Sequence, residues 1–244
     1  MKMLKFFLVS IGLAIASLTF NSCLDDENSY SLGNMWVSIA TARPISDNSF
    51  YLTLDDSTTL WPAAPLYINY QPVKPQRVQI NYTKLGDNFE GYDHAIKLNK
   101  LDIILTKPIS ENLGAKNDSV YGTDPVEITA MWVGDGFLNI EFKTYFSGGI
   151  DHFVNLLPAT ADNEDPYKLE FRHNAMGDKA SSRRRYGFVA FDLSSLPNTD
   201  GKDVKLLITA NTFDGVKEFE KKYNSGKNTE QAGKLSSDEF EKIM

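Results

Sequence analysis

The sequence predicts an all-β protein in which a five-stranded barrel is followed by a β-sandwich. Three observations lead to this fold class. Short segments rich in β-branched and aromatic residues recur along the chain, turn residues separate them, and no stretch beyond the N-terminal segment has a convincing helical period. Of the 244 residues, 42% are hydrophobic and 23% are charged, which is typical of a globular protein.

The first group of strand signals predicts the barrel, over residues 35–107. Strands are expected at 35–42, 50–54, 77–83, 95–99 and 101–106. The alternation is clearest at residues 78–82, where Val78, Ile80 and Tyr82 fall on one face. Closure into a barrel removes the exposed edges of such short strands. A long loop with four prolines separates the second strand from the third, and a turn is expected near Gly91.

The second group of strand signals predicts the sandwich, over residues 125–223. Residues 108–124 have little periodicity and are expected to form a linker. Strands are then expected at 126–133, 138–146, 152–157, 168–173, 187–193 and 204–212. Gly134-Asp135-Gly136, Asp200-Gly201 and Asp214-Gly215 are turn signals, and this spacing is typical of a two-sheet sandwich. Residues 224–244 form a polar tail that is expected to be poorly ordered.

Residues 1–22 are predicted to be a lipoprotein signal peptide. Lys2 and Lys5 precede an apolar segment, residues 6–20, which is shorter than the roughly 20 residues of a membrane-spanning helix. The residues up to Cys23, the single cysteine, resemble a relaxed bacterial lipobox. Cys23 is therefore expected to carry a lipid anchor. The alternative is ordinary cleavage near Ser22 that leaves Cys23 as a free thiol.

Residues 23–34 are predicted to be a tether between the anchor and the barrel. Asp25, Asp26 and Glu27 follow the anchor and resemble the acidic export signal of lipoproteins displayed on the outer leaflet. The expected location is the outer membrane, at the cell surface rather than facing the periplasm. The alternative is that these acids are a solvated spacer in a periplasm-facing protein.

Composition and motifs exclude several function classes. The net charge of −7 argues against a nucleic-acid partner, and one cysteine excludes a disulfide framework. His94, His152 and His173 are far apart in sequence and lack zinc-site spacing, so no metal or cofactor is expected. Asp55-Asp56 and residues 162–165 are interpreted as solvated loops rather than Ca²⁺ ligands. No catalytic motif is present, and the protein is not expected to be an enzyme.

Two groups of residues are candidates for ligand binding. Trp61, Tyr67 and Tyr70 lie in the proline-bearing loop, where aromatic rings can stack on a sugar or on a partner's apolar side chain. The alternative is that Trp61 closes one end of the barrel. The second group, Arg183-Arg184-Arg185, can contact anionic lipid headgroups, a sulfated glycan or an acidic partner, or can be a solvated hairpin.

Six segments resemble a known family. FYLTLDDSTTLWP at residues 50–62, QRVQINY at 76–82 and YDHAIKL at 92–98 look like the N-terminal domain of NigD-like lipoproteins. ITAMWV at 128–133, FLNI at 137–140 and YGFVAF at 186–191 look like their C-terminal domain. The resemblance implies an OB-like barrel followed by a β-sandwich. It also carries an immunity role, which is attached to the family name, and it brings no catalytic residues.

These observations predict a lipid-anchored, non-catalytic outer-membrane protein. Its partners are expected to be the membrane, through the N-terminal lipid, and an unidentified protein or glycan. A bacteriocin immunity protein is the first alternative, and an uncharacterised enzyme is the lesser one.

Overall fold

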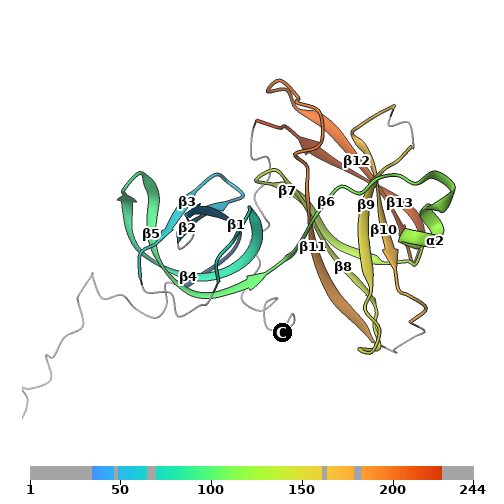
Figure 1. Ribbon diagram of the computed structural model, residues 1–244, viewed down its shortest axis with the longest axis horizontal. Helices are drawn as coiled ribbons and strands as arrows, with labels where there is room; N and C mark the ends of the chain where they lie inside the picture. Colours follow the sequence, from blue (N-terminus) through green and yellow to red (C-terminus); the bar gives the residue numbers. More distant parts are fainter. Residues whose placement is uncertain (1–34, 47–48, 65–69, 161–163, 179–182, 227–244) are drawn as a thin grey trace, which may run out of the picture. The chain divides into compact units, whose positions relative to one another are not determined.

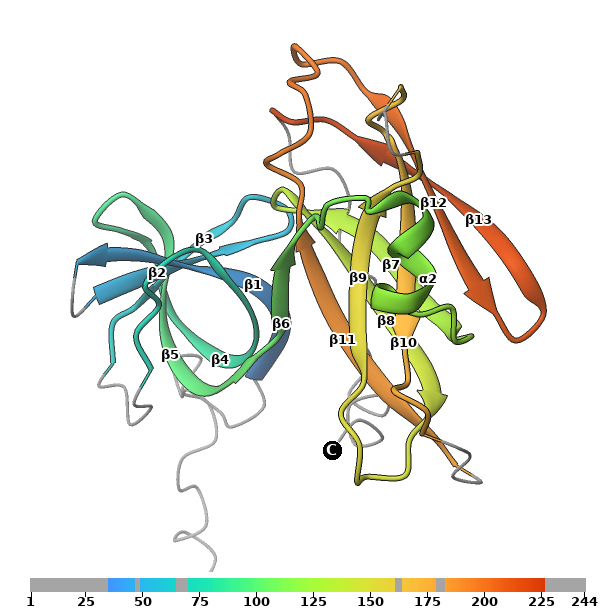
Figure 2. The same cartoon turned by 45° about the vertical axis from the view of Figure 1, so that its right-hand side comes forward.

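The computed structural model describes residues 35–46, 49–64, 70–160, 164–178 and 183–226, within one compact unit, Met35–Met244 (Figures 1 and 2). It contains a closed barrel of five strands and two four-stranded sheets, which confirms the predicted fold class. The predicted signal peptide (1–22), the tether (23–34) and residues 227–244 of the predicted tail lie outside the described residues.

The barrel consists of β1 (Met35–Ser46), β2 (Ser49–Leu54), β3 (Thr59–Pro62), β4 (Gln76–Phe89) and β5 (Tyr92–Ile103). Its strand order is β1-β2-β3-β5-β4, and β4 closes the barrel against β1. Val78, Ile80 and Tyr82 are all buried in the barrel core, as their alternation predicts. The turn expected near Gly91 joins β4 to β5, with Glu90 and Gly91 at positive φ.

The barrel differs from the prediction in two strands. β3 lies inside the predicted proline-bearing loop, and β5 joins the expected strand 95–99 to the first part of the expected strand 101–106. The rest of that expected strand, from residue 105, belongs to a separate strand of the sandwich. β3 has only four residues and ends at Pro62, so it has almost no local strand signal. It is held by parallel pairing of Leu60 with His94 and of Trp61 with Ala95, and such long-range pairing is not visible in a local pattern.

The sandwich core lies between two sheets. One sheet has the order β6-β11-β8-β7 and the other β13-β12-β10-β9. The strands are β6 (Leu105–Pro108), β7 (Glu127–Gly134), β8 (Phe137–Tyr145), β9 (Phe153–Pro158), β10 (Lys168–Asn174), β11 (Arg184–Asp192), β12 (Val204–Thr212) and β13 (Gly215–Tyr223). Leu138, Ile140, Leu156, Val189 and Phe191 are among the buried residues between the sheets.

The predicted linker, residues 108–124, is ordered against the sandwich. Pro108 ends β6, which pairs with β11 in parallel, and Ser110 N–H donates to the Leu156 carbonyl at 2.8 Å. A 3₁₀ turn (Gly114–Lys116) and the short helix α2 (Asn117–Tyr121) follow, and α2 packs near β9 and β10. The polar and glycine content of this segment reflects local turns and side-chain caps, such as Asn117 Oδ1 accepting from Leu113 N–H, rather than a free linker.

The β7–β8 hairpin has the turn that its glycines predict. Asp135 has φ 47° and Gly136 has φ 81°, so both central residues take the left-handed conformation that two-residue hairpins favour. A Cβ on Gly134 would lie 2.3 Å from the carboxyl carbon of Asp55, on the barrel. Only glycine therefore lets this hairpin approach the β2–β3 turn so closely.

A buried ion pair joins the barrel to this hairpin. Asp55, predicted to lie in a solvated loop, has a side chain only 4% exposed, and Arg77 of β4 is fully buried. Arg77 Nη2 donates to Asp55 Oδ1 at 2.6 Å, and Trp132 Nε1 donates to Asp55 Oδ2 at 2.8 Å. Arg77 also donates to Asn139 Oδ1 of β8 at 3.2 Å. Burial raises the pKa of Asp55 above its ordinary value, while Arg77 and the Trp132 N–H act in the opposite direction.

An apolar cluster surrounds the ion pair. Ile39 and Ile104 pack with Trp132, Phe137 and Ala190 of the sandwich. This cluster keeps water from the Asp55–Arg77 pair, so each charge depends on the other for compensation.

We predict that Asp55→Asn lowers the free energy of unfolding by about 3–5 kcal/mol, because Arg77 becomes a buried cation without a counter-charge. Urea denaturation measures the change. The control is Lys205→Met, which breaks the exposed Lys205–Glu220 pair and is expected to cost less than about 1 kcal/mol. Equal, small losses in both variants would contradict the prediction.

Candidate functional site

Three aromatic rings form a strip on the outside of the barrel. Tyr51 of β2, Tyr92 of β5 and Trp61 of β3 lie next to one another and are called the aromatic strip here. The Trp61 and Tyr92 rings are stacked, with centroids 5.1 Å apart and planes at 25°, and the Tyr51 and Tyr92 centroids are 5.5 Å apart. Leu52 and Leu60, the chain neighbours of Tyr51 and Trp61, point into the barrel core, so these two rings face outward.

A carboxylate lies beside the strip. Asp93 follows Tyr92, and one of its oxygens accepts hydrogen bonds from the Thr59 N–H and from the Thr59 hydroxyl, both at 2.7 Å. The backbone hydrogen bond from Thr59 is the main reason that the pKa of Asp93 lies below its ordinary value. The strip is thus an aromatic surface with an ionised, oriented acceptor at its edge.

The structure separates the three predicted aromatic residues. Trp61 belongs to β3 and stacks on the outer surface, and does not close a barrel end. Tyr70 instead packs against the barrel core, edge-on to Phe50 with centroids 5.7 Å apart. Burial raises the pKa of Tyr70 to about 12. Tyr67 lies outside the described residues.

Sequence reasoning missed Tyr51 and Tyr92 as partners of Trp61. The sequence feature that could have identified them is their position: each lies near the start of a strand, at a position that alternation places on the outside of the barrel. What brings the three rings together is the strand order β2-β3-β5, which required the unpredicted strand β3.

The arginine triplet lies at the start of β11, three residues earlier than the strand was expected. Arg184 is engaged within the molecule, since it donates to Glu127 at 2.6 Å and lies over the rings of Phe213 and Tyr145, 4.1 and 5.3 Å from their centroids. The hydrogen bond to Glu127 raises the pKa of Arg184. Arg185 is exposed, and Arg183 also has an interaction partner. The middle arginine is therefore already paired rather than presented to a ligand.

Two histidines that are distant in sequence meet in the sandwich. Antiparallel pairing of β9 with β10 brings His152 to His173, with His152 Nδ1 and His173 Nε2 3.0 Å apart. His152 Nε2 is 3.1 Å from Asp178 Oδ2, and His173 Nδ1 is 3.3 Å from the Asp124 carbonyl oxygen. His94 lies in the barrel, 2.7 Å from Asp87. His152 and His173 are therefore in contact although they are far apart in sequence, because strand pairing, not sequence spacing, sets their distance.

The environment of His173 disfavours a charge on its ring. Burial is the main cause that lowers the pKa of His173 to about 4, and the neighbouring His152 adds to this effect. Asp124 acts in the opposite direction without cancelling it. His173 is therefore neutral at neutral pH.

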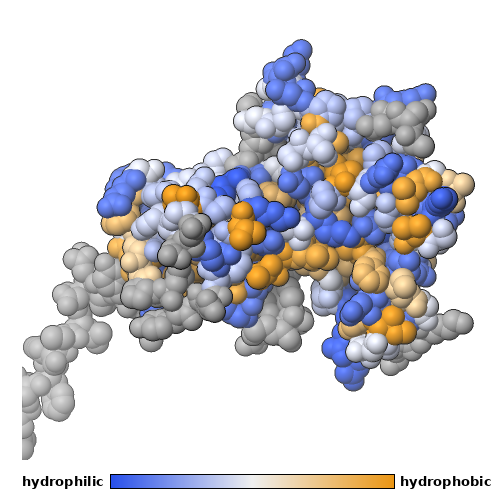
Figure 3. All heavy atoms as spheres, viewed as in Figure 1, coloured by the Kyte–Doolittle hydropathy of each residue, from blue (hydrophilic) through white to orange (hydrophobic). Residues whose placement is uncertain are grey.

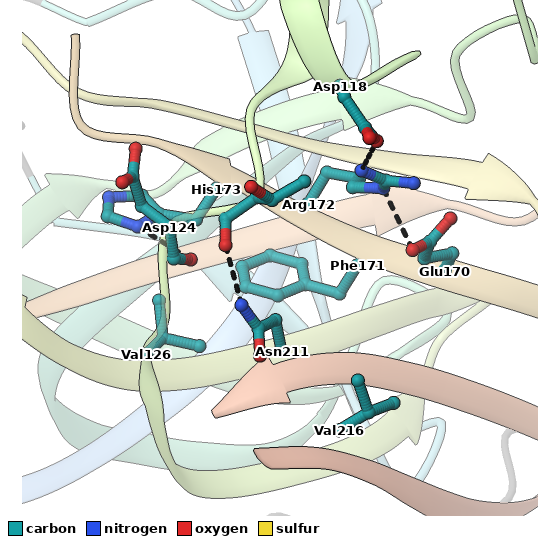
Figure 4. Close-up of a pocket in the computed structure, with 10 residues that line it drawn as sticks. Asp118, Asp124, Val126, Glu170, Phe171, Arg172, His173, Asn211 and Val216 are labelled. Carbon is teal, nitrogen blue, oxygen red and sulfur yellow. Dashed lines mark hydrogen bonds and ion pairs between the residues drawn. The ribbon is translucent and has the colours of Figure 1, made fainter. Parts of the chain in front are cut away.

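A cavity of about 230 Å³ lies next to His173 (Figure 4). It is lined by Asp118, Thr123, Asp124, Val126, Glu170, Phe171, Arg172, His173, Asn211 and Val216. Its polar groups bind one another: Arg172 contacts Asp118 at 2.7 Å and Glu170 at 2.8 Å, while Asn211 Nδ2 donates to the Thr123 carbonyl at 2.6 Å. Figure 4 shows Arg172 directed toward these two acids. A ligand in this cavity would compete with existing ion pairs.

In the described part of the chain, no group of three or more His, Cys, Asp or Glu side chains is arranged to hold a metal ion. No helix there is both long enough and apolar enough to cross a membrane. Cys23, Asp25, Asp26 and Glu27 lie outside the described residues.

Comparison with known proteins identifies two domains. The NigD-like N-terminal OB domain matches residues 39–104, and the NigD-like C-terminal beta sandwich domain matches residues 107–223. A Parabacteroides distasonis protein, described as a candidate toxin-related protein, has a solved structure that is 49% identical with a TM-score of 0.72, over 78% of this chain and 94% of that one. No curated protein matches the chain.

Two more distant structures share the fold alone. A NigD-like immunity protein from Bacteroides caccae is 19% identical, with a TM-score of 0.57 over 75% of this chain and 91% of its own. A candidate lipoprotein from Bacteroides fragilis is 15% identical, with a TM-score of 0.52 over 79% of this chain and 100% of its own.

We predict that stability falls as the pH decreases from 6.5 toward 4. In this window the unfolded chain binds a proton at His173, whose ordinary pKa is 6.5, whereas the folded chain does so only near pH 4. The full difference corresponds to about 3 kcal/mol. Urea midpoints across this range measure it, and His173→Gln is expected to flatten the slope. The control is His94→Gln; a slope that His173→Gln leaves unchanged would refute the assignment.

Proposed function

The chain belongs to the NigD-like family, and from that premise we propose that it is a non-catalytic binding protein, lipid-anchored in the outer membrane, whose aromatic strip takes up a glycan. The observation that carries this proposal is the contact of Tyr51, Tyr92 and Trp61 on the outside of the barrel. OB barrels bind oligosaccharides and other chains through one sheet face and the adjoining loops. The strip occupies such a face, across β2, β3 and β5.

The chemistry beside the strip favours a sugar over a purely apolar partner. Aromatic rings give a sugar an apolar face to stack on, and Asp93 supplies a fixed carboxylate acceptor for sugar hydroxyls. Because Thr59 holds Asp93 in place, this acceptor is oriented before a ligand arrives. A stable protein–protein interface buries roughly 800 Å² on each partner, which is more than three half-buried rings supply.

The buried charged groups of the described residues also agree with a binding role. The cavity next to His173 is lined by charged groups that pair with one another, so they are not poised as acid, base or nucleophile. Asp55, the most buried acid described at the barrel, is held by Arg77 and Trp132. These carboxylates support the structure, in keeping with a protein that binds rather than transforms its ligand.

Removing the half-buried indole of Trp61 tests the glycan proposal. We expect Trp61→Ala to weaken binding to a panel of cell-surface polysaccharides by roughly 5- to 150-fold, taking for the sugar the roughly 1–3 kcal/mol that stacking a planar base on an aromatic ring contributes. Isothermal titration of the full chain in detergent measures this. Trp36→Ala is the matched control, since Trp36 is a barrel tryptophan 53% exposed outside the strip. Binding that Trp36→Ala weakens and Trp61→Ala does not would move the site elsewhere.

An immunity role is the second candidate function. Its support is that one protein of the same fold, from Bacteroides caccae, is described as an immunity protein. In this case the ligand is a bacteriocin, and cells that express the chain survive a toxin that kills cells lacking it. The same Trp61→Ala variant separates the two roles, because survival without polysaccharide binding favours immunity.

We predict that Cys23→Ala moves the protein from the membrane fraction to the soluble fraction. Two sequence features support a lipid anchor at Cys23: the apolar segment 6–20 and the single cysteine that follows it. A protein of the same fold with a solved structure is also described as a candidate lipoprotein. Fractionation followed by immunoblotting measures the change. Ser22→Thr, which keeps the cysteine, is the control; a Cys23→Ala chain that stays membrane-bound would place the anchor elsewhere.

Surface display is the finer part of this proposal and rests on Asp25, Asp26 and Glu27. Their charges next to the anchor keep the tether hydrated and accessible to an export receptor. Protease added to intact cells is expected to degrade the native chain and to spare a variant with alanine at all three positions. Equal protection of both would show a periplasm-facing protein.

A further inference from the structure

We propose that His152 and His173 carry one proton more than two neutral rings would and, with Asp178, form a pH-sensitive link that fixes the loops at one end of the sandwich. This inference is independent of the proposed glycan site, which lies on the barrel. It rests on the contacts of three side chains that come from the β8–β9 loop, the end of β10 and the turn that follows β10.

The hydrogen-bond partners determine where the protons lie. The Asp124 carbonyl can only accept, so His173 Nδ1 carries a proton that points to it, 3.3 Å away. His173 is neutral, which leaves its Nε2 with a lone pair directed at His152 Nδ1, 3.0 Å away. That contact is favourable only if His152 Nδ1 carries a proton, because two facing lone pairs repel.

The other ring nitrogen of His152 faces a carboxylate. Asp178 Oδ2 lies 3.1 Å from His152 Nε2 and also accepts the Ser147 N–H at 2.8 Å. The pKa of Asp178 is lowered, first by this backbone hydrogen bond, so Asp178 is ionised and accepts at both contacts. Both nitrogens of His152 therefore donate, and the ring is an imidazolium between Asp178 and neutral His173.

The number of protons on the two rings determines which of their hydrogen bonds can form. With one extra proton, every contact from Asp178 through His152 and His173 to Asp124 is a hydrogen bond. Without it, one hydrogen bond of His152 is lost. With a second proton, two positive rings lie side by side and repel. The titratable groups that face the pair are Asp178, from the turn after β10, and Asp124, from the segment before β7.

This link holds exposed apolar side chains in place. Antiparallel pairing of Phe153 with Asn174 places the residues just before β9 beside those just after β10. Ile150, Phe153 and Met176 on these segments are 41%, 51% and 53% exposed. Figure 3 shows hydrophobic atoms at the end of the sandwich where β8 leads into β9. Because His173 also lines the cavity of Figure 4, the proton count affects the loops and the cavity together.

Nuclear magnetic resonance of the full chain, ¹⁵N-labelled at its three histidines, tests the proposal directly. In a series of spectra at different pH we expect a state in which His152 is doubly protonated and His173 is neutral and protonated at Nδ1. His94 serves as the internal reference, because it lies in the barrel. Asp178→Asn is expected to remove the His152 signature while leaving His94 unchanged. A neutral His152, or two rings that titrate independently of Asp178, would overturn the proposal.

Hydrogen exchange at the Ser147 amide measures the effect on the loops. When His152 loses its proton, exchange corrected for the intrinsic rate is expected to accelerate about tenfold, which is the order of one charge-assisted hydrogen bond. The Thr59 amide, bound to Asp93 in the barrel, is the control and is expected to keep its protection. Constant Ser147 protection across the His152 titration would refute the link.

A metal ion between the two rings is the competing explanation. Both histidines have the second hydrogen-bond partner that metal-bound histidines usually have. Addition of a chelator distinguishes the cases: the proposal requires unchanged ¹⁵N shifts at His152 and His173, whereas a change confined to these two rings would overturn it in favour of a bound ion.

Discussion

The structure depends above all on the buried contact between Asp55 and Arg77. Burying two charges is costly, and the cost is offset only when both are fully hydrogen-bonded. That condition draws in Trp132 and Asn139 from two strands of the sandwich, so the ion pair is complete only when barrel and sandwich are both folded. A buried ion pair of this kind adds little net stability, but loss of either partner leaves the other charge uncompensated. Gly134 also contributes, because any side chain there would collide with the Asp55 carboxylate.

The outward face of β2 connects this ion pair to the aromatic strip. Tyr51 contributes to the strip, Thr53 accepts from Arg43 at 3.2 Å, and Asp55 pairs with Arg77, at alternate positions along the chain. Arg43 in turn forms two 2.7 Å hydrogen bonds to Asp135 of the β7–β8 turn. One end of β2 is therefore fixed by the sandwich, while the half-buried ring of Tyr51 near the other end belongs to the aromatic strip. A binding surface built on such a fixed strand loses little entropy when a ligand binds.

The fold class could be predicted from the sequence because its evidence is local. The alternation that buries one face of β4, and the glycine turns between strands, act over a few residues. The features that matter for the candidate site are set by pairing between distant segments. Trp61 joins the aromatic strip only through the four-residue strand β3, and His152 meets His173 only through the pairing of β9 with β10. Asp55 was interpreted as solvated because its partner, Arg77, is 22 residues away. No spacing rule reveals such partners.

The edge strand β13 affects whether neighbouring copies of the chain can pair edge to edge. It is the outermost strand of its sheet, and its exposed side chains include Lys217, Glu218, Glu220 and Lys222. A free strand edge invites pairing with the same edge of a neighbour, and charged side chains of both signs along it oppose such growth. Molecules held on a membrane meet far more often than molecules in solution. For the lipid-anchored protein proposed above, charged edges of this kind oppose polymerisation even at high lateral density.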